Sequence, residues 1–148
     1  MKVKDCMCND ICSVKPNSKI DEVAKLMCSN HVGCIPVCDD NNCIVGIVTD
    51  RDIILRSIAC DKNVTTTPVS DIMTCDVCTC GCDDDMKNAE EKMAKNQIRR
   101  LPVIENNKVV GMLTIGDLAH FDNELGKDCV CTTISDICNC DGETKNAQ

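Results

Sequence analysis

The chain has 148 residues, a formal net charge of -8 and a sequence pI of about 4.6. Such an acidic chain is poorly suited to binding nucleic acid or an anionic membrane non-specifically, because both interactions depend on clustered Lys and Arg. No apolar run approaches the roughly 20 residues that span a bilayer, and the N-terminal residues lack the apolar stretch of a signal peptide. These features predict a cytoplasmic protein.

The first part of the chain predicts a short α/β unit. Ser13–Val14 is a brief extended piece, and Ser18 can cap a helix whose apolar residues recur at helical spacing. Two apolar strands follow, Cys34–Cys38 and Ile44–Val48, separated by a polar turn. Thr49 can cap a second helix, and its apolar residues are Ile53, Ile54 and Ile58.

The same order of residues occurs a second time. Ile35-Pro36-Val37 is matched by Leu101-Pro102-Val103, 66 residues later, and Gly46-Ile47-Val48-Thr49 is matched by Gly111-Met112-Leu113-Thr114. In the second copy Asp83-Asp84-Asp85 supplies the helix start, where acidic residues are favoured. The duplication predicts a first repeat over residues 1–60, a linker over 61–68, a second repeat over 69–122 and a C-terminal tail over 123–148 that carries Cys-x-Cys pairs.

This doubled pattern resembles a tandem pair of cystathionine-β-synthase-type (CBS) domains of the stand-alone bacterial kind. The residues that carry the resemblance are Pro-Val followed by Gly-x-x-Thr-x-x-Asp in each copy, above all Val48-Thr49-Asp50-Arg51-Asp52, and the Asp-x-Met opening at Asp5 and Asp71. The resemblance covers residues 1 to about 121. It implies an α/β (α+β) fold in which two β-α-β-β-α repeats pack as a pseudo-twofold module, and a homodimer of such modules.

The resemblance also implies a regulatory ligand-binding protein and not an enzyme. An adenosine-containing nucleotide, AMP, ADP or ATP, is expected in clefts between the two repeats, and no cofactor is required. Asp52 and Asp117 match the family's ribose-binding position, where a carboxylate accepts hydrogen bonds from hydroxyls. Cys34–Pro36 and Arg100–Pro102 match its base-binding position, and Ser13–Val14 and Thr79–Cys80 are expected to form the opposite wall. The expected ligand-binding residues are Ser13, Val14, Cys34, Ile35, Pro36, Thr49, Arg51, Asp52, Thr79, Cys80, Arg100, Leu101, Pro102, Thr114 and Asp117.

Helix capping is a second explanation for the central residues. Thr49 and Asp52 are three residues apart, as are Thr114 and Asp117, and this spacing is that of a capping box. Spacing alone favours capping, whereas the repeat and the family resemblance favour a ligand role in at least one copy. The copies also differ, because Asp50-Arg51 in the first is Ile115-Gly116 in the second. Occupancy of a single site is therefore plausible.

Sixteen cysteines are unusual for a chain of this length. Five of them, Cys6, Cys28, Cys38, Cys43 and Cys80, stand opposite ordinary apolar or small residues across the repeat and are predicted to be small buried hydrophobes. Paired cysteines in the tail favour another hypothesis, a metal site in which thiolates bind zinc. The candidate ligands are Cys129, Cys131, Cys138 and Cys140.

Three functions remain open from the sequence. The first is a nucleotide sensor, the second a thiol-based zinc or redox sensor on the same scaffold, and the third a structural dimeric adaptor. An unidentified regulated enzyme or transporter is the expected partner of the first. No nucleophile elbow, P-loop or dinucleotide-binding motif is present in the sequence.

Overall fold

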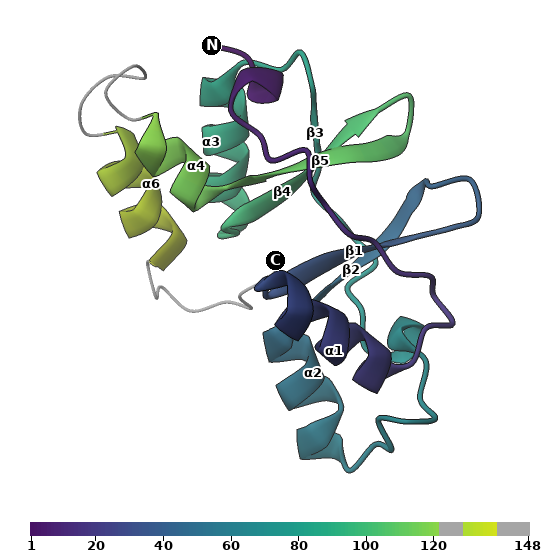
Figure 1. Cartoon of the computed structure of the whole chain (residues 1–148). Helices are drawn as coiled ribbons and strands as arrows, with labels where there is room; N and C mark the ends of the chain where they lie inside the picture. The colour runs from purple at the N-terminus through teal and green to yellow at the C-terminus, as the bar shows by residue number, and fades with distance from the viewer. Residues whose placement is uncertain (122–128, 139–148) are drawn as a thin grey trace. The chain divides into compact units, whose positions relative to one another are not determined.

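The computed structural model describes residues 1–121 and 129–138, except for the side chain of Cys129 (Figure 1). The chain forms two compact units, each built mainly from one repeat. The first-repeat unit comprises mainly Cys12–Val77. The second-repeat unit joins Met1–Ile11 to Cys78–Asn106 and to the described residues from Val110 onward. The predicted α/β fold with a tandem repeat is confirmed.

The first-repeat unit places two helices beside an antiparallel pair of strands. Its elements are α1 (Ile20–Asn30), β1 (Cys34–Cys38), β2 (Ile44–Thr49), α2 (Asp50–Arg56), and the short 3-10 helices η2 (Ile58–Cys60) and η3 (Val69–Asp71). Cys34 is paired with Thr49 at the end of the β1–β2 ladder. Val14 extends the pair by one parallel bridge to Val37. The sheet therefore brings the predicted site residues of this repeat onto neighbouring strands.

The predicted helix stripe forms the core of this unit. Ile20 and Val23 are fully buried and Met27 is nearly so, because α1 lays this face against the strands. The prediction that Ser18 caps α1 is wrong. Lys19 occupies the N-cap position and its amide donates to the Glu22 carboxylate at 2.9 Å, whereas the Ser18 hydroxyl accepts from the Lys15 amide at 3.2 Å and closes the preceding turn.

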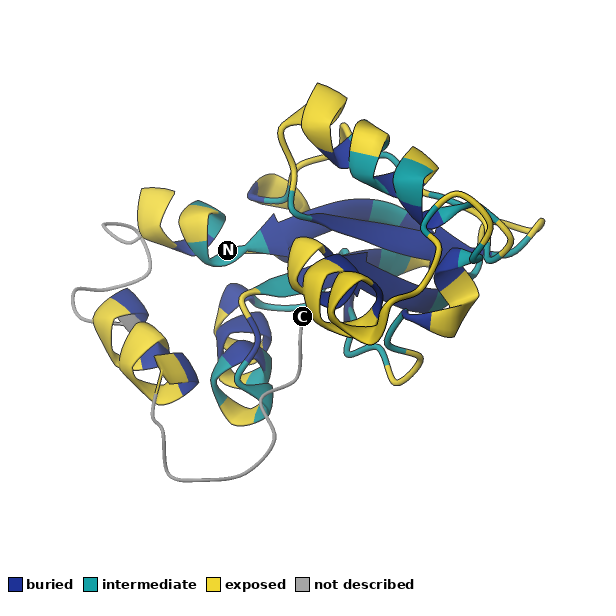
Figure 2. Ribbon diagram, turned by 90° about the horizontal axis from the view of Figure 1, so that it is seen from below, coloured by how far each residue is buried: buried dark blue, intermediate teal, exposed yellow. Residues whose placement is uncertain are grey.

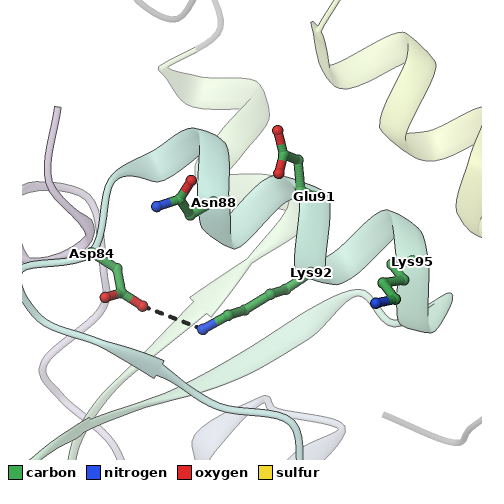
Figure 3. A pocket seen from close by; sticks show the side chains of 5 residues that line it. All are labelled: Asp84, Asn88, Glu91, Lys92 and Lys95. Atoms are coloured by element: carbon green, nitrogen blue, oxygen red, sulfur yellow. Dashed lines mark hydrogen bonds and ion pairs between the residues drawn. The ribbon is translucent and has the colours of Figure 1, made fainter.

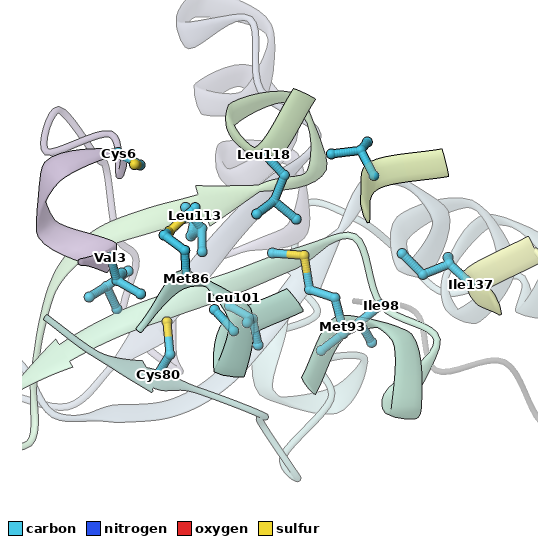
Figure 4. Close-up of a cluster of buried hydrophobic side chains, with 13 residues drawn as sticks. Val3, Cys6, Cys80, Met86, Met93, Ile98, Leu101, Leu113, Leu118 and Ile137 are labelled. Carbon is cyan, nitrogen blue, oxygen red and sulfur yellow. The ribbon is translucent and has the colours of Figure 1, made fainter. Parts of the chain in front are cut away.

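The second-repeat unit repeats this arrangement with an added helix. Its elements are η1 (Val3–Asp5), β3 (Cys80–Gly81), α3 (Met86–Asn96), β4 (Arg100–Glu105), β5 (Lys108–Thr114), α4 (Ile115–His120) and α6 (Cys129–Cys138). The strands form one sheet in the order β3-β4-β5, with β3 parallel to β4. As predicted, the acidic run begins α3, since the Asp85 side chain accepts from the Lys87 amide at 3.0 Å. Figure 4 shows the aliphatic core, with Met86, Met93 and Leu113 among its fully buried side chains.

The opening segment of each repeat packs on the sheet of the other repeat. Cys8, near the N-terminus, exchanges two backbone hydrogen bonds with Met112 of β5, at 2.9 and 3.0 Å. Thr74, at the equivalent position of the second repeat, exchanges two with Ile47 of β2, both at 2.9 Å. The compact units therefore differ in composition from the repeats of the sequence. Cutting the chain between residues 61 and 68 would leave each sheet without its bridging segment.

The tail contributes a helix, α6, which the sequence did not predict. It packs on α3 and α4 of the second-repeat unit and buries Val130 and Ile137 in the core of that unit. The Thr133 hydroxyl donates to the Glu90 carboxyl of α3 at 2.6 Å, and both residues are at most 5% exposed. Figure 2 shows the burial of the whole described chain, with the strands mostly dark blue, for buried, and the outer faces of the helices yellow, for exposed. No helix among the described residues is both long and apolar enough to cross a membrane.

Candidate functional site

In the first repeat, Thr49 and Asp52 form a closed capping box at the start of α2. The Thr49 hydroxyl accepts from the Asp52 amide at 3.2 Å. The Asp52 Oδ2 atom accepts from the Thr49 amide at 2.9 Å and from its hydroxyl at 3.0 Å. Both residues are buried, with 2% of each exposed. The capping interpretation of these residues is therefore correct for the geometry, and one carboxylate oxygen is fully used by it.

The second oxygen of Asp52 also has a partner. Arg56, one turn later on α2, brings its Nε atom to 3.5 Å from Asp52 Oδ1. The same guanidinium donates through Nη1 to the carbonyls of Ile72 and Met73 and to the Thr74 hydroxyl, at 3.2, 3.4 and 3.4 Å. The proposed ribose acid of the first repeat is thus satisfied on both oxygens.

The second repeat has the same capping box but no counterpart of this arginine. The Thr114 amide and hydroxyl donate to Asp117 Oδ2 at 2.7 and 2.8 Å, and the Asp117 amide donates back to the hydroxyl at 3.3 Å. Phe121 stands where the first repeat has Arg56. Within the described part of the chain, Asp117 Oδ1 has no hydrogen bond or ion pair. Asp117 is only half-buried, so this oxygen can meet a ligand.

The charges at the two helix starts also differ. In the first repeat the Asp50 carboxylate opens α2 and accepts from the Arg51 amide at 2.9 Å. In the second repeat the uncharged Ile115 opens α4, and its amide donates to the Arg99 carbonyl at 2.9 Å. Arg100 begins β4 and Arg99 directly precedes it. The first repeat thus has opposite charges, Asp50 and the exposed Arg51, at its helix start, whereas the second has no charge at the equivalent pair and two arginines on the adjoining segment.

The predicted base-binding strands are buried. Ile35 and Leu101 are fully buried in the two cores, and Pro36 and Pro102 are buried too. The side chains of these residues are therefore not available to a ligand. Arg100 remains half-buried.

The expected opposite walls lie next to these strands. In the first repeat the Val14 amide donates to the Pro36 carbonyl at 3.0 Å. In the second, Cys80 pairs with Val103 in the parallel β3–β4 ladder. Each repeat thus brings its wall and its base-binding strand together in one sheet.

A lysine fixes the wall of the second repeat. Lys92 of α3 donates to the Thr79 carbonyl at 3.1 Å and forms an ion pair with Asp84 at 3.3 Å (Figure 3). The backbone amide of Gly81 donates to Asp84 and, with Lys92, holds the pKa of that carboxyl below its usual value. Leu26 replaces Lys92 in the first repeat. This contact holds Thr79 in place, and the sequence pattern did not indicate it.

The cysteines divide between core and surface. Cys6, Cys38 and Cys80 are buried as predicted, and burial raises the pKa of the Cys80 thiol to about 12. The prediction is wrong for Cys28, which is exposed on α1, and Cys43 is half-buried. The sequence alone predicts that His31 and His120 are surface or helix-end residues and not ligands, and both lie at helix ends.

The proposed zinc ligands are only partly described. Cys131 and Cys138 are exposed on α6, whereas the Cys129 side chain and Cys140 lie outside the described residues. In an extended segment Cys129 and Cys131 would project to the same side and could bind one metal ion together. Both residues lie on a helix, where residues two apart do not share a face. Among the described side chains, no three of His, Cys, Asp or Glu converge to hold a metal ion.

A family model for the CBS domain matches residues 3–58 and 69–124, one match in each repeat. The chain is a tandem pair of CBS domains. It is 40% identical over 117 residues to the CBS domain-containing protein YhcV of Bacillus subtilis, covering 79% of this chain and 82% of YhcV. Part of a longer enzyme also matches. The homoserine O-acetyltransferase of Methanohalobium evestigatum is 34% identical over 123 residues, which are 82% of this chain and 24% of that enzyme.

Solved structures give the same result. The CBS domain protein TA0289 of Thermoplasma acidophilum is similar with a TM-score of 0.78 and 28% identity, over 93% of this chain and 74% of that one. The CBS domain pair of the protein MJ0100 was solved in complex with 5′-methylthioadenosine and S-adenosyl-L-methionine. It is similar with a TM-score of 0.76 and 28% identity, over 85% of this chain and 98% of that one.

Proposed function

We propose that this CBS pair is a regulatory module that binds one adenosine-containing molecule at its second repeat. Asp117 accepts hydrogen bonds from the ribose hydroxyls, and the neighbouring Arg99 and Arg100 receive a phosphate or another anionic group. Pro102 and Thr79 lie on the side of the site where the base is expected. The module senses the ligand and catalyses no reaction.

One observation carries this proposal: the two proposed ribose acids differ in whether their second carboxylate oxygen has a partner. Asp117 keeps Oδ1 without a partner in the described part of the chain, while Asp52 has both oxygens engaged. A carboxylate oxygen that is already oriented by a capping box and still open to ligand costs little to reorganise when it binds. The second repeat is therefore the better ribose site.

Charge supports the same choice. The chain is acidic overall, so an anionic ligand needs local compensation. Arg99 and Arg100 supply it beside α4, where the first repeat has Gly33 and Cys34. In the first repeat Asp50 offsets the charge of its neighbour Arg51. Nucleotides with phosphates should therefore prefer the second repeat.

The similar proteins support an adenosine ligand and a regulatory role. MJ0100 binds two adenosine derivatives through a CBS pair of the same fold. In the acetyltransferase, a segment like this chain is part of a longer enzyme. We therefore infer that ligand binding here changes the activity of a separate or attached enzyme or transporter.

Calorimetric titration with AMP, ATP, 5′-methylthioadenosine and S-adenosylmethionine tests the proposal. We expect Asp117→Asn to weaken binding of the preferred ligand by about 10- to 100-fold, since it removes a charged acceptor. Asp52→Asn is the matched control and should leave affinity unchanged at temperatures where the protein is folded. Absence of binding to all four ligands, or equal affinity of wild type and Asp117→Asn, would reject the proposal. Because the chain lacks Trp and Tyr, a co-purified adenine would also dominate its absorbance near 260 nm.

The second part of the proposal is self-association. Ile54, Leu55 and Ile58 on α2 and η2 are 55%, 46% and 60% exposed. Their counterparts in the second repeat include Ala119 and His120, which are less apolar. We propose that this ridge, Ile54–Leu55–Ile58, is buried against the same ridge of a second copy in a twofold dimer. Ile53, which the sequence pattern grouped with the ridge, is buried in the core instead.

A further inference from the structure

Arg56 is the single cation in contact with the ribose acid of the first repeat, among the residues that the structure describes. It reaches Asp52 Oδ1 through Nε, while Nη1 faces two carbonyls and a hydroxyl of the segment Ile72–Thr74. The guanidinium is planar and forked, so it can serve the carboxylate and this segment together. Its position is therefore fixed from two sides.

The segment that holds Arg56 is itself anchored. Thr74 exchanges two backbone hydrogen bonds with Ile47 of β2, and the Met73 side chain packs against Gly46. Arg56 consequently rests on a rigid part of the first-repeat unit and not on a loop tip. A ligand hydroxyl that competed for Asp52 Oδ1 would have to displace an arginine with four contacts.

We propose that Arg56 is a specificity-determining residue that closes the first repeat to adenosine ligands and leaves the second repeat as the one binding site. This inference rests on the proposed function, because it assumes that Asp52 and Asp117 are equivalent ribose acids. The second repeat has Phe121 at the position of Arg56, and Phe offers no donor to Asp117. One arginine thus accounts for the difference between two otherwise matching capping boxes.

The ligand that an opened first repeat would accept follows from its charge. Asp50 and Arg51 at the start of α2 carry opposite charges, so this site offers no net positive charge to a phosphate, whereas an uncharged nucleoside needs none. Removing the guanidinium gives Asp52 Oδ1 the freedom that Asp117 Oδ1 already has. 5′-Methylthioadenosine is therefore the suitable probe, because it retains the ribose hydroxyls and has no phosphate.

The test counts binding sites by calorimetric titration with 5′-methylthioadenosine. Wild type should bind one equivalent and Arg56→Gln two. The added site should weaken in Arg56→Gln combined with Asp52→Asn, and Asp117→Asn in the Arg56→Gln background should weaken the original site, each by about 10- to 100-fold. Lys62→Gln, which removes an exposed cation of the same unit that has no side-chain partner among the described residues, should still bind one. Arg56→Met, which keeps the aliphatic stem, replaces Arg56→Gln if that variant does not fold.

The outcomes separate this inference from the proposed function. Two equivalents in wild type, or no additional equivalent in either folded Arg56 variant, would overturn the role of Arg56. If wild type binds no adenosine ligand at all, the proposed function fails. In that case one equivalent gained by Arg56→Gln would still support the closure of the first repeat by Arg56.

Discussion

The Met73 sulfur lies so close to Gly46 that a Cβ on that glycine would come within 2.5 Å of it. Met73 belongs to the Asp-x-Met opening of the second repeat, and Gly46 to β2 of the first. The same relationship joins Met7, from the opening of the first repeat, to Gly111 of β5, with a distance of 2.6 Å. The methionine and the glycine of the family pattern are therefore packing partners. Because each glycine lacks a side chain, the opening segment of the other repeat can pack closely on its strand.

Gly111→Ala should be the more damaging of the two glycine substitutions. At Gly111 the added Cβ also meets the Cys8 carbonyl at 3.0 Å, and that carbonyl is fixed by its hydrogen bond from Met112. At Gly46 it meets only the flexible Met73 side chain among the three nearest atoms. We expect Gly111→Ala to lower the free energy of unfolding by about 1–3 kcal/mol, as overpacking does, and Gly46→Ala to lower it less. Urea unfolding measures both, and equal stability of Gly111→Ala and wild type would contradict the packing argument.

Periodicity and the repeat predicted most of the fold. The α1 stripe, the two apolar strands and the acidic start of α3 follow from local spacing, and the structure confirms them. The packing of each opening segment on the other repeat did not follow, because a bridge between residues as distant as Cys8 and Met112 leaves no local pattern. Helix α6 was also missed, since its buried residues Val130 and Ile137 stand among cysteines and threonines that dilute the apolar signal.

The sequence predicted the positions of the site residues but not the difference between the two repeats, in which Asp52 pairs with an arginine and Asp117 does not. Spacing identified Thr49, Asp52, Thr114 and Asp117, and the structure brings each pair together. Spacing did not identify Arg56 as the partner of Asp52, because an arginine four residues after an aspartate is common on exposed helices. The comparison of Arg56 with Phe121 across the repeat was the available signal.

Replacing each ribose acid should affect stability to different extents. Asp52→Ala removes a buried carboxylate that caps α2 and pairs with Arg56, whereas Asp117→Ala removes a half-buried cap only. We expect a loss of about 1–3 kcal/mol for Asp52, because buried donors at the start of α2 lose their acceptor, and about 0.5–2 kcal/mol for Asp117, as for losing a cap. Thermal unfolding in the absence of nucleotide measures them. A larger loss for Asp117→Ala would show that the two acids have been assigned the wrong roles.

Thiol labelling should follow exposure and not position in the chain. The sequence alone predicts that the tail thiols react first, because tails are less protected than cores, but Cys8, Cys28, Cys60 and Cys75 are exposed as well as Cys131. Burial raises the pKa of the Cys80 thiol from 9.0 to about 12, which keeps this thiol protonated and unreactive at pH 8. Mass spectrometry after brief alkylation at pH 8 should find Cys131 modified and Cys80 unmodified.

The same thiol affects stability at high pH. A folded-state pKa above the unfolded value means that the native state binds more protons between pH 9 and pH 12, so the free energy of unfolding falls as the pH rises through that interval. Cys80→Ala should reduce this slope. Early labelling of Cys80 at pH 8, or an unchanged slope in Cys80→Ala, would contradict its burial in the core.

The hydrogen bond between Thr133 and Glu90 should hold α6 on α3. Thr133→Val keeps the shape of the side chain and removes the donor to a buried carboxyl. Its loss should cost about 1.5–3 kcal/mol, the range for a hydrogen bond to a charged group, and should speed hydrogen exchange of the α6 amides. Ser135→Ala, at an exposed position of the same helix, is the control and should change neither quantity. Unchanged exchange in Thr133→Val would show that Val130 and Ile137 alone dock the helix.

The proposed dimer makes the ridge Ile54–Leu55–Ile58 the place where a charge is least tolerated. A combined Ile54→Glu and Ile58→Glu variant places two carboxylates in a surface that would be desolvated on association, and facing copies would add like-charge repulsion. Analytical ultracentrifugation at micromolar concentration should find wild type as a dimer and this variant as a monomer, with unchanged thermal stability per chain at low concentration. Ile134→Glu provides the matched control, because Ile134 is also an exposed apolar residue, 44% accessible, but lies on α6. A monomeric wild type would contradict the dimer. A dimeric ridge variant together with a monomeric Ile134→Glu would place the interface on α6 instead of the ridge.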